Sequence, residues 1–518
     1  MISIGSARNG EKTARYRGAL LHSAYNPGRE ADRFVRTVEK RRCYVVLGGG
    51  LGHLATALAS LRPDSLICTV HPDPVLREAA ADTPGAHLSV QSEEELESGL
   101  AAAFGNELRY GFELLSWEPA RRADASWFSR QEEQLLAIAR RNHHSLLTTG
   151  YFGFRWTLNS FRNSLRFRNS RGWSPPSDRR PVLVAPGPSL ERVIPWLRQE
   201  RSRSYLVALS SAYGTLLHYG LTPDLLLHSD GGYWAARHLG DPPTEPGGAP
   251  PLASTIRAAI PANFHPRRSL FLTDPTSPVE TALGALFTAP LLPIRGHGTV
   301  AGTALRLLQG LFPDPPVLVG VDLASRGYVG HSRPHTFDPL LLSRIDRLAP
   351  LPGVLRRRLG RIRRSYPGWE QTATQQIYAG SLSSELAGRG DSPKRIYPSP
   401  VSLPCSEQDP SAPLPPPSAT RRDMELIPGE APVVEPEKLL ARWQEALKEW
   451  SPSEAVGIGR SESGNVPLLE ELAQLLALPE LLRLRRGWEQ EGEVEGAFAE
   501  LVTAIERSLE RISERVAV

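Results

Sequence analysis

Residues 181–197 read PVLVAPGPSLERVIPWL, an apolar strand that turns through glycine and two prolines into a helical pattern. Two further apolar strands follow, YLVAL at 205–209 and DLLLHSD at 224–230, with a helical pattern over 212–219 between them. This spacing predicts a βαβαβ unit and therefore a parallel sheet. Because ligands bind at the carboxyl ends of such strands, the loops that leave those ends predict one crevice.

Two of these loops carry candidate binding residues. Gly187 would let the backbone approach a ligand closely, and Ser189, at the start of the helix, offers a hydroxyl beside free N–H groups that favour phosphate. Asp230 directly follows its strand and could bind a metal or a sugar hydroxyl. A simple turn with a helix cap explains the Gly187–Ser189 segment about equally well.

These residues belong to a longer set in a fixed order. The set resembles the core of the motility accessory factor (Maf) flagellin glycosyltransferases, which share that core with the MptE-like 6-hydroxymethylpterin diphosphokinases. The resemblance extends over residues 19–336. The motifs that carry it are VAPGPSL at 184–190, GLTPD at 220–224, HSD at 228–230, GTVA at 298–301, VGVDL at 319–323 and His331, with YNP at 25–27 and Trp156, Asn159 and Asn163 upstream.

The resemblance implies a reaction and a site. Maf-like proteins have a core similar to bacterial sialyltransferases and move a nonulosonic, sialic-acid-like sugar from a CMP donor to serine or threonine of flagellin, a step needed for flagellar assembly and motility. The implied catalytic residues are His331 as the base, Asp322 at the rim, and Asp230, which orients the donor or a Mg²⁺ ion. The implied substrate-binding residues are Gly187, Pro188, Ser189, Asp224, Gly298, Thr299, Arg333, Asn159 and Asn163.

Two other functions remain open from the sequence. An ATP-dependent 6-hydroxymethylpterin diphosphokinase would use the same loops for a triphosphate and Mg²⁺, although that enzyme type is expected to be compact. A non-catalytic assembly factor would bind flagellin and keep only the fold.

The segment 325–335 is rich in groups that can react or bind. Histidine is the usual proton acceptor near neutral pH, so His331 or His335 could deprotonate a hydroxyl, and the resemblance favours His331. Arg326 and Arg333 could pair with a carboxylate or phosphate. A solvated polar loop is the alternative. For Asn159 and Asn163, which share one helix face, anchoring of a neighbouring loop is more common than ligand binding.

A second glycine turn lies near the N-terminus. The apolar strand 43–47 leads into GGGLGH at 48–53, and a further strand follows at 67–70. A nucleotide or S-adenosylmethionine site would need an acidic residue directly after that second strand, where the sequence has His71-Pro72-Asp73. Close packing of strand and helix explains the turn at least as well.

The predicted fold is therefore α/β in several domains. We expect a Rossmann-like N-terminal domain at 1–150, a central Maf/MptE-like catalytic domain at 151–395, a proline-rich linker at 396–432 and a C-terminal helical module at 433–518. The apolar stripe of that module predicts packing on the core or on a second copy, so a homo-oligomer is possible. The run of arginines over 355–364 is expected on a solvated helix face.

Composition narrows the class of protein. The net charge is only +4 and no DNA- or RNA-binding motif is present, so no nucleic-acid partner is expected. The three cysteines, Cys43, Cys68 and Cys405, are too scattered for a disulfide framework or a zinc site. No apolar run is long enough to span a membrane, and no signal peptide is visible, which predicts a cytoplasmic protein without membrane insertion.

Overall fold

The computed structural model describes residues 2–168, 178–240, 248–288, 291–359, 362–387, 392–396, 399–417, 434–458, 464–490 and 492–516. The chain forms two compact units. The first is Met1–Gly153 with Gln444–Leu509, and the second is Phe154–Trp443 with Glu510–Val518. The long helix α6 (Ala125–Arg166) contributes to both.

A nine-stranded sheet forms the centre of the second unit, and every neighbouring pair of its strands is parallel. The predicted parallel sheet and the mixed α/β class are therefore confirmed. In spatial order the strands are β13 (Leu291–Pro293), β12 (Ser269–Thr273), β11 (Leu252–Thr255), β10 (Leu225–His228), β9 (Ser204–Leu209), β8 (Arg180–Val184), β14 (Val317–Val319), β18 (Lys394–Ile396) and β19 (Ser406–Gln408).

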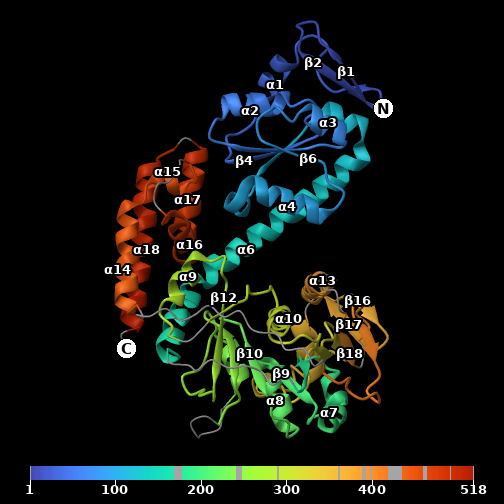
Figure 1. Cartoon of the computed structure of the whole chain (residues 1–518), viewed down its shortest axis with the longest axis vertical. Helices are drawn as coiled ribbons and strands as arrows, with labels where there is room; N and C mark the ends of the chain where they lie inside the picture. The colour runs from blue at the N-terminus through green and yellow to red at the C-terminus, as the bar shows by residue number, and fades with distance from the viewer. Residues whose placement is uncertain are drawn as a thin grey trace. The chain divides into compact units, whose positions relative to one another are not determined.

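Helices cover both faces of this sheet (Figure 1). Val182 and Val184 of β8 pack in one buried cluster with α7 (Leu190–Gln199) and α8 (Ser210–His218). Leu183, between them, packs in another cluster with α10 (Val300–Leu311) and α13 (Ala373–Ala387). Because successive side chains of a strand point to opposite faces, the continuous apolar run in β8 is what a strand covered on both sides requires.

A smaller antiparallel sheet follows β14. Its order is β15 (Ser325–Arg326), β17 (Trp369–Thr372), β16 (Ile362–Tyr366), and the helices α11 (Asp338–Leu342) and α12 (Leu351–Leu359) precede β16. The arginine run 355–364 is thus not one helix face: α12 ends at Leu359 and β16 begins at Ile362. The turn through Gly368, which has φ +74°, pairs Tyr366 with Trp369 and draws 362–366 into a hairpin. The unit also contains α9 (Pro278–Gly284) and the 3₁₀ helix η2 (Ala235–Leu239).

The segment predicted as a linker is ordered over 399–417. Its strand β19 pairs with β18, and the Trp196 indole N–H donates to the carbonyl of Ala412 at 3.0 Å. Leu414 is 1% exposed and packs in the core. The apolar side chains scattered among the prolines therefore attach this stretch to the sheet, whereas residues 418–433 lie outside the described part.

The first unit is built on a four-stranded parallel sheet of order β6-β5-β4-β7. Its strands are β4 (Cys43–Leu47), β5 (Leu66–Val70), β6 (Ala86–Leu88) and β7 (Glu113–Ser116). An N-terminal antiparallel sheet contains β1 (Ile2–Ser6), β2 (Lys12–Tyr16) and β3 (Ala19–Leu20). The helices are α1 (Pro27–Val35), α2 (His53–Leu61), α3 (Pro74–Ala79), α4 (Glu93–Phe104), the 3₁₀ helix η1 (Gly105–Tyr110) and α5 (Glu118–Ala123).

The C-terminal helices up to Leu509 pack into this first unit. They are α14 (Pro436–Glu449), α15 (Pro452–Ala455), α16 (Val466–Leu476), α17 (Leu478–Glu489) and α18 (Val494–Val516), of which α14 and α18 extend into the second unit. The buried guanidinium of Arg485 makes two hydrogen bonds, 2.6 and 2.9 Å long, to the buried carboxylate of Glu107. Among the described helices, none is both long and apolar enough to cross a membrane.

Candidate functional site

The strand order of the large sheet reverses between β8 and β14. The chain runs outward from β8 to β13 and then returns to place β14 on the other side of β8. In open parallel sheets, ligands bind at the carboxyl ends of the strands at such a switch point. The loop after β8 carries Gly187, Pro188 and Ser189, and the loop after β14 carries Asp322, so these four residues meet there.

The two loops are closed onto each other. The Asp322 carboxylate accepts one hydrogen bond from the backbone N–H of Ser189 and one from its hydroxyl, both at 2.7 Å. The N–H of Gly187 donates to the carbonyl of Gly320 at 2.8 Å, and a Cβ on Gly187 would lie 2.3 Å from that oxygen. Gly187 is therefore required by the contact between the loops, and the Ser189 N–H that was expected to hold phosphate binds a carboxylate of the protein instead.

Asp322 is buried at 2% exposure rather than open at the rim. Burial raises the pKa of its carboxyl group, against the opposing effect of the two bonds from Ser189. Its backbone carbonyl also accepts a hydrogen bond from the Ser399 hydroxyl at 2.7 Å. Asp322 therefore holds the loops after β8 and β14 together at the switch point.

The histidine-bearing loop is fixed against the loop after β8. The N–H of Ser332 donates to the carbonyl of Pro186 at 2.6 Å, and the N–H of Arg333 donates to the Glu191 carboxylate at 2.9 Å. These bonds join the loop to the start of α7. His331 is exposed beside them, and its ring stacks on that of His335 with centroids 4.5 Å apart and planes 19° apart.

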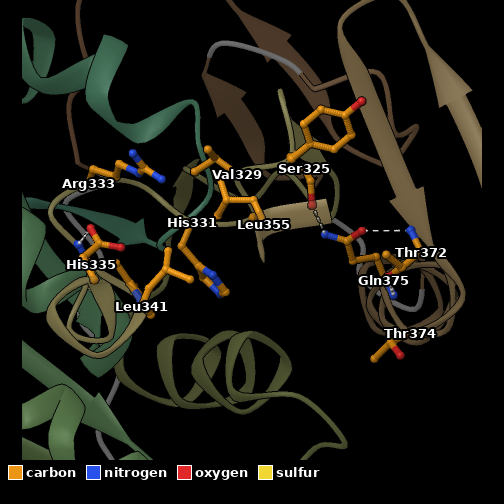
Figure 2. Close-up of a pocket in the computed structure, with 13 residues that line it drawn as sticks. Ser325, Val329, His331, Arg333, His335, Leu341, Leu355, Thr372, Thr374 and Gln375 are labelled. Carbon is orange, nitrogen blue, oxygen red and sulfur yellow. Dashed lines mark hydrogen bonds between the residues drawn. The ribbon is translucent and has the colours of Figure 1, made fainter. Parts of the chain in front are cut away.

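A cavity of about 320 Å³ opens next to His331. Figure 2 shows His331, Leu341 and Leu355 on one side, with Ser325, Gln375 and Thr372 joined by hydrogen bonds on the other. Arg333 also lines it, and the Arg333 Nε is buried with no hydrogen-bond partner among the described residues. A cavity of this size that is lined by a histidine and an arginine can accept an anionic ligand of small-molecule size.

Asp230 lies at the same edge, after β10. Its side chain is exposed, and Oδ1 accepts a hydrogen bond from the N–H of Gly232 at 2.7 Å. Next to it, His228 is fully buried, and burial lowers its pKa despite the opposing charge of Asp230. His238 follows in η2, where burial first and His228 second lower its pKa to about 4. The ring of His238 lies 5.4 Å from that of His335, which connects Asp230 to the histidine loop.

The two asparagines of α6 anchor loops. The Asn159 amide donates to the carbonyls of Gly231 and Arg257 at 3.3 and 3.0 Å. The buried Asn163 amide donates to the carbonyls of Ile256 and Ala258, both at 2.9 Å. These bonds fix the loops that leave β10 and β11. Both amide groups therefore hold in place the loops at the carboxyl edge of the sheet.

Asp224 does not belong to the site. It immediately precedes β10 and therefore lies at the amino end of the sheet, opposite the crevice. Its carboxylate makes ion pairs with Arg179 and Arg201, each at 2.9 Å, and accepts the N–H of Leu206 at 2.8 Å. The structure therefore places Asp224 away from the crevice, and the substrate-binding role predicted for it stays a prediction that this position does not favour.

Gly298 and Thr299 directly precede α10, which packs over β8, β9 and β10. The Thr299 hydroxyl caps the helix by accepting the N–H of Gly302 at 3.0 Å, and it lies 3.1 Å from the Nδ1 of His297. Gly298 is exposed beside it. The hydroxyl thus has a local structural role in this loop.

The glycine turn of the first unit is filled by the protein itself. A Cβ on Gly50 would lie 2.2 Å from the Nε2 of His22, and one on Gly52 would lie 2.2 Å from the Thr83 hydroxyl. The Nε2 of His22 accepts the N–H of Leu51 at 2.9 Å. The side chains of His22 and Thr83 therefore occupy the space beside the turn that a dinucleotide phosphate would need. This favours the interpretation that the glycines serve close packing.

Several residues at the edge of the sheet were not predicted. Ser210 follows β9, and its hydroxyl is 3.0 Å from the Nδ1 of His228, whose Nε2 is 2.9 Å from the carbonyl of Ala259. Tyr233 and Trp234 are 61% and 52% exposed just beyond Asp230. The only sequence signal for these aromatic residues is their position directly after a strand end. In the described part of the chain, no cluster of three or more histidine, cysteine or acidic side chains is arranged to hold a metal ion.

Comparisons with known proteins identify one family model, one sequence relative and one solved structure that this chain is similar to. Residues 158–327 match the family model described as 6-hydroxymethylpterin diphosphokinase MptE-like. An uncharacterized protein of Treponema pallidum (strain Nichols) is 29% identical over 261 residues, or 48% of this chain and 55% of that protein. The chain thus spans about half the length of this curated relative.

The solved structure of a Maf glycosyltransferase from Magnetospirillum magneticum AMB-1 resembles the whole chain. The TM-score is 0.56 at 13% sequence identity, and the alignment covers 100% of this chain and 91% of that one. At this sequence identity the likeness is one of fold. Residues 158–327 are therefore similar to the MptE-like family model, in a chain whose fold is similar to that of a Maf glycosyltransferase.

Proposed function

We propose that this protein is a glycosyltransferase that moves a nonulosonic sugar from a CMP donor to serine or threonine of flagellin, in support of flagellar assembly and motility. The observation that carries the proposal is the cavity that both His331 and Arg333 line, in a chain with this fold. A nonulosonic donor carries a carboxylate and a phosphate, and either one suits the Arg333 guanidinium.

In the proposed reaction, His331 and Arg333 take part in a single step, the transfer of the sugar to the acceptor hydroxyl. His331 takes the proton of the acceptor hydroxyl while that oxygen bonds to the anomeric carbon of the sugar. The bond between that carbon and the phosphate oxygen breaks, and CMP leaves with the electron pair. Arg333 stabilises negative charge on the donor, and the hydrogen bonds between Ser189 and Asp322 hold both loops in place.

The proposal is tested by thermal unfolding of the whole chain with CMP, CDP, ATP or GTP, each with and without Mg²⁺. A ligand present at one hundred times its dissociation constant adds about 2.7 kcal/mol to the stability. We expect stabilisation by CMP that is lost in Arg333→Met. The matched control is Arg155→Met, because Arg155 is exposed on α6, outside the cavity.

A second candidate function has a specific observation in its favour, namely the match of residues 158–327 to the diphosphokinase family model. Under that alternative, ATP with Mg²⁺ stabilises the chain and CMP does not. Asp230 would then be the ligand of the ion, since Mg²⁺ binds through one or two carboxylates together with substrate phosphates. The absence of any nucleotide response would instead indicate the non-catalytic assembly factor.

A further inference from the structure

The positive charge of the chain is concentrated in one segment. Residues 344–366 contain eight arginines and a single acidic residue, Asp346, although the whole chain carries a net charge of only +4. The rest of the chain therefore has more acidic than basic side chains. The segment runs from the end of α11 through α12 and into β16. It lies next to the cavity of His331, because Leu355 of α12 lines that cavity.

Six arginines of this segment have described side chains, and all six are open to solvent. The described residues provide no ion-pair partner for these six: Arg344, Arg347, Arg356, Arg357, Arg363 and Arg364. Elsewhere in the second unit, arginines such as Arg179 and Arg306 are paired with carboxylates. A group of unpaired arginines on one segment forms a local positive field, which attracts anions.

A second cavity lies among these arginines. Its volume is about 390 Å³, and its lining combines four apolar side chains with two of the exposed arginines: Phe337, Leu340, Leu341, Val354, Arg344 and Arg357. Leu341 lines this cavity and the cavity of His331, so the two are adjacent. Leu342 and Leu348 nearby are 58% and 88% exposed. The surface therefore offers apolar contacts and positive charge together.

We propose that this second cavity and its six exposed arginines dock an acidic segment of the acceptor protein, with an apolar side chain of that segment in the cavity and its carboxylates on the arginines. The proposal rests on the proposed transfer to a protein. Leu341 of α11 and Leu355 of α12 line the cavity of His331, so the arginine-rich segment borders the space that an acceptor hydroxyl would enter. An acceptor segment held there would therefore present its hydroxyl beside the base.

A protein fits this surface better than a nucleic acid does. Phe337 is the one aromatic side chain in residues 337–359, and its ring already packs against the rings of His238 and His335, whereas single-stranded nucleic acid is held by stacking of successive bases on aromatic rings. The exposed leucines and the apolar cavity have no counterpart in a sugar-phosphate backbone. An amphipathic acidic peptide matches both kinds of contact.

The test uses the whole chain and a fluorescein-labelled synthetic peptide that alternates glutamate with leucine and contains one serine. Binding is followed by fluorescence anisotropy, and we expect it to weaken as salt is added. Arg344→Glu combined with Arg357→Glu should raise the dissociation constant at least about tenfold, because each substitution replaces attraction by repulsion. The matched control combines Arg155→Glu with Arg268→Glu, both exposed in the same unit and outside the cavity.

Peptides with lysine for glutamate, or serine for leucine, should bind at least about tenfold more weakly. Equal binding by the charge-reversed pair and the parent chain overturns the proposal, and so does tighter binding of phosphatidylglycerol vesicles or a single-stranded oligonucleotide than of the peptide. Peptide binding is measured without a sugar donor. A chain that fails to bind the peptide but is stabilised by CMP would therefore overturn the docking surface and leave the proposed sugar transfer standing. All the substituted arginines are exposed, and unchanged unfolding temperatures verify that the variants fold.

Discussion

The Asp322 carboxylate bridges two loops by accepting both hydrogen-bond donors of Ser189, each at 2.7 Å. One loop follows the first strand of the large sheet and the other follows the strand that reverses its order. The geometry of the crevice therefore depends on a buried contact within the protein, made before any ligand arrives.

Ser189→Ala should destabilise the second unit. The substitution removes one of two donors to a buried carboxylate, and such a loss costs about 1–3 kcal/mol. Chemical denaturation measures it, with Ser411→Ala as the control, because Ser411 donates to Asp409 at the exposed surface. An equal effect of both substitutions would mean that Asp322 finds another donor.

Asp322→Asn should change how stability depends on pH. Burial holds the carboxyl pKa above its unfolded value, so its stabilising effect is full below the unfolded pKa and is lost as pH rises through the folded pKa. The amide has no such titration. Denaturation from pH 4 to pH 8 should therefore show a smaller loss of stability toward high pH in the variant than in the parent.

His331→Ala should abolish most sugar transfer while leaving the fold intact. Loss of a general base typically lowers the rate about 10²–10⁴-fold. Release of CMP from a nonulosonic donor in the presence of flagellin measures the rate. His265→Ala is the matched control, because His265 is exposed and precedes β12 at the other end of the sheet. Comparable rates for both variants would remove His331 from the reaction.

The first unit should lose stability on acidification through His22. Burial, with a smaller effect of His53, lowers the His22 pKa to about 3. The unfolded chain therefore binds a proton below pH 6.5 that the folded chain does not, which costs about 2 kcal/mol at pH 5. His22→Gln keeps an acceptor for the Leu51 N–H and should reduce the difference in stability between pH 7 and pH 5. An unchanged difference would show that His22 is charged in the fold.

Gly50→Ala and Gly10→Ala should separate strain from steric overlap. Both glycines have positive φ, +60° and +87°, but a Cβ on Gly10 meets nothing within 4 Å, whereas one on Gly50 overlaps His22. Gly10→Ala should cost about 1 kcal/mol from backbone strain alone, and Gly50→Ala should cost clearly more. Equal costs in thermal unfolding would mean that His22 moves freely away from the turn.

The sheet could be predicted from the sequence because its strands are continuous apolar runs that glycine and proline separate. The strand predicted at 205–209 is β9, and the strand predicted at 224–230 is the shorter β10, Leu225–His228. Because β10 ends at His228, Asp230 lies after its carboxyl end as predicted. Asp224 was predicted as the first residue of that strand, and chain direction alone places such a residue at the amino end of the sheet.

Other features depend on contacts between residues far apart in the chain. The pairing of Ser189 with Asp322 spans 133 residues, and neither motif indicates that the other satisfies it. The same holds for Arg485 and Glu107, which lie 378 residues apart. Local pattern reveals a strand end or a helix cap, whereas the partner of a buried charge is decided by the whole fold.

That last ion pair has a practical consequence for work with shorter recombinant fragments. A fragment that stops at residue 153 would lack Arg485, which makes both short hydrogen bonds to the Glu107 carboxylate, and would keep only the longer ion pair of that carboxylate with Arg42 at 3.8 Å. Breaking a buried ion pair by removing one partner is destabilising. A fragment that begins at residue 178 would lack Asn159 and Asn163 and so release the loops at the substrate edge. A stable fragment of the first unit would therefore need to include the C-terminal helices. A stable fragment of the second unit would need to include the end of α6.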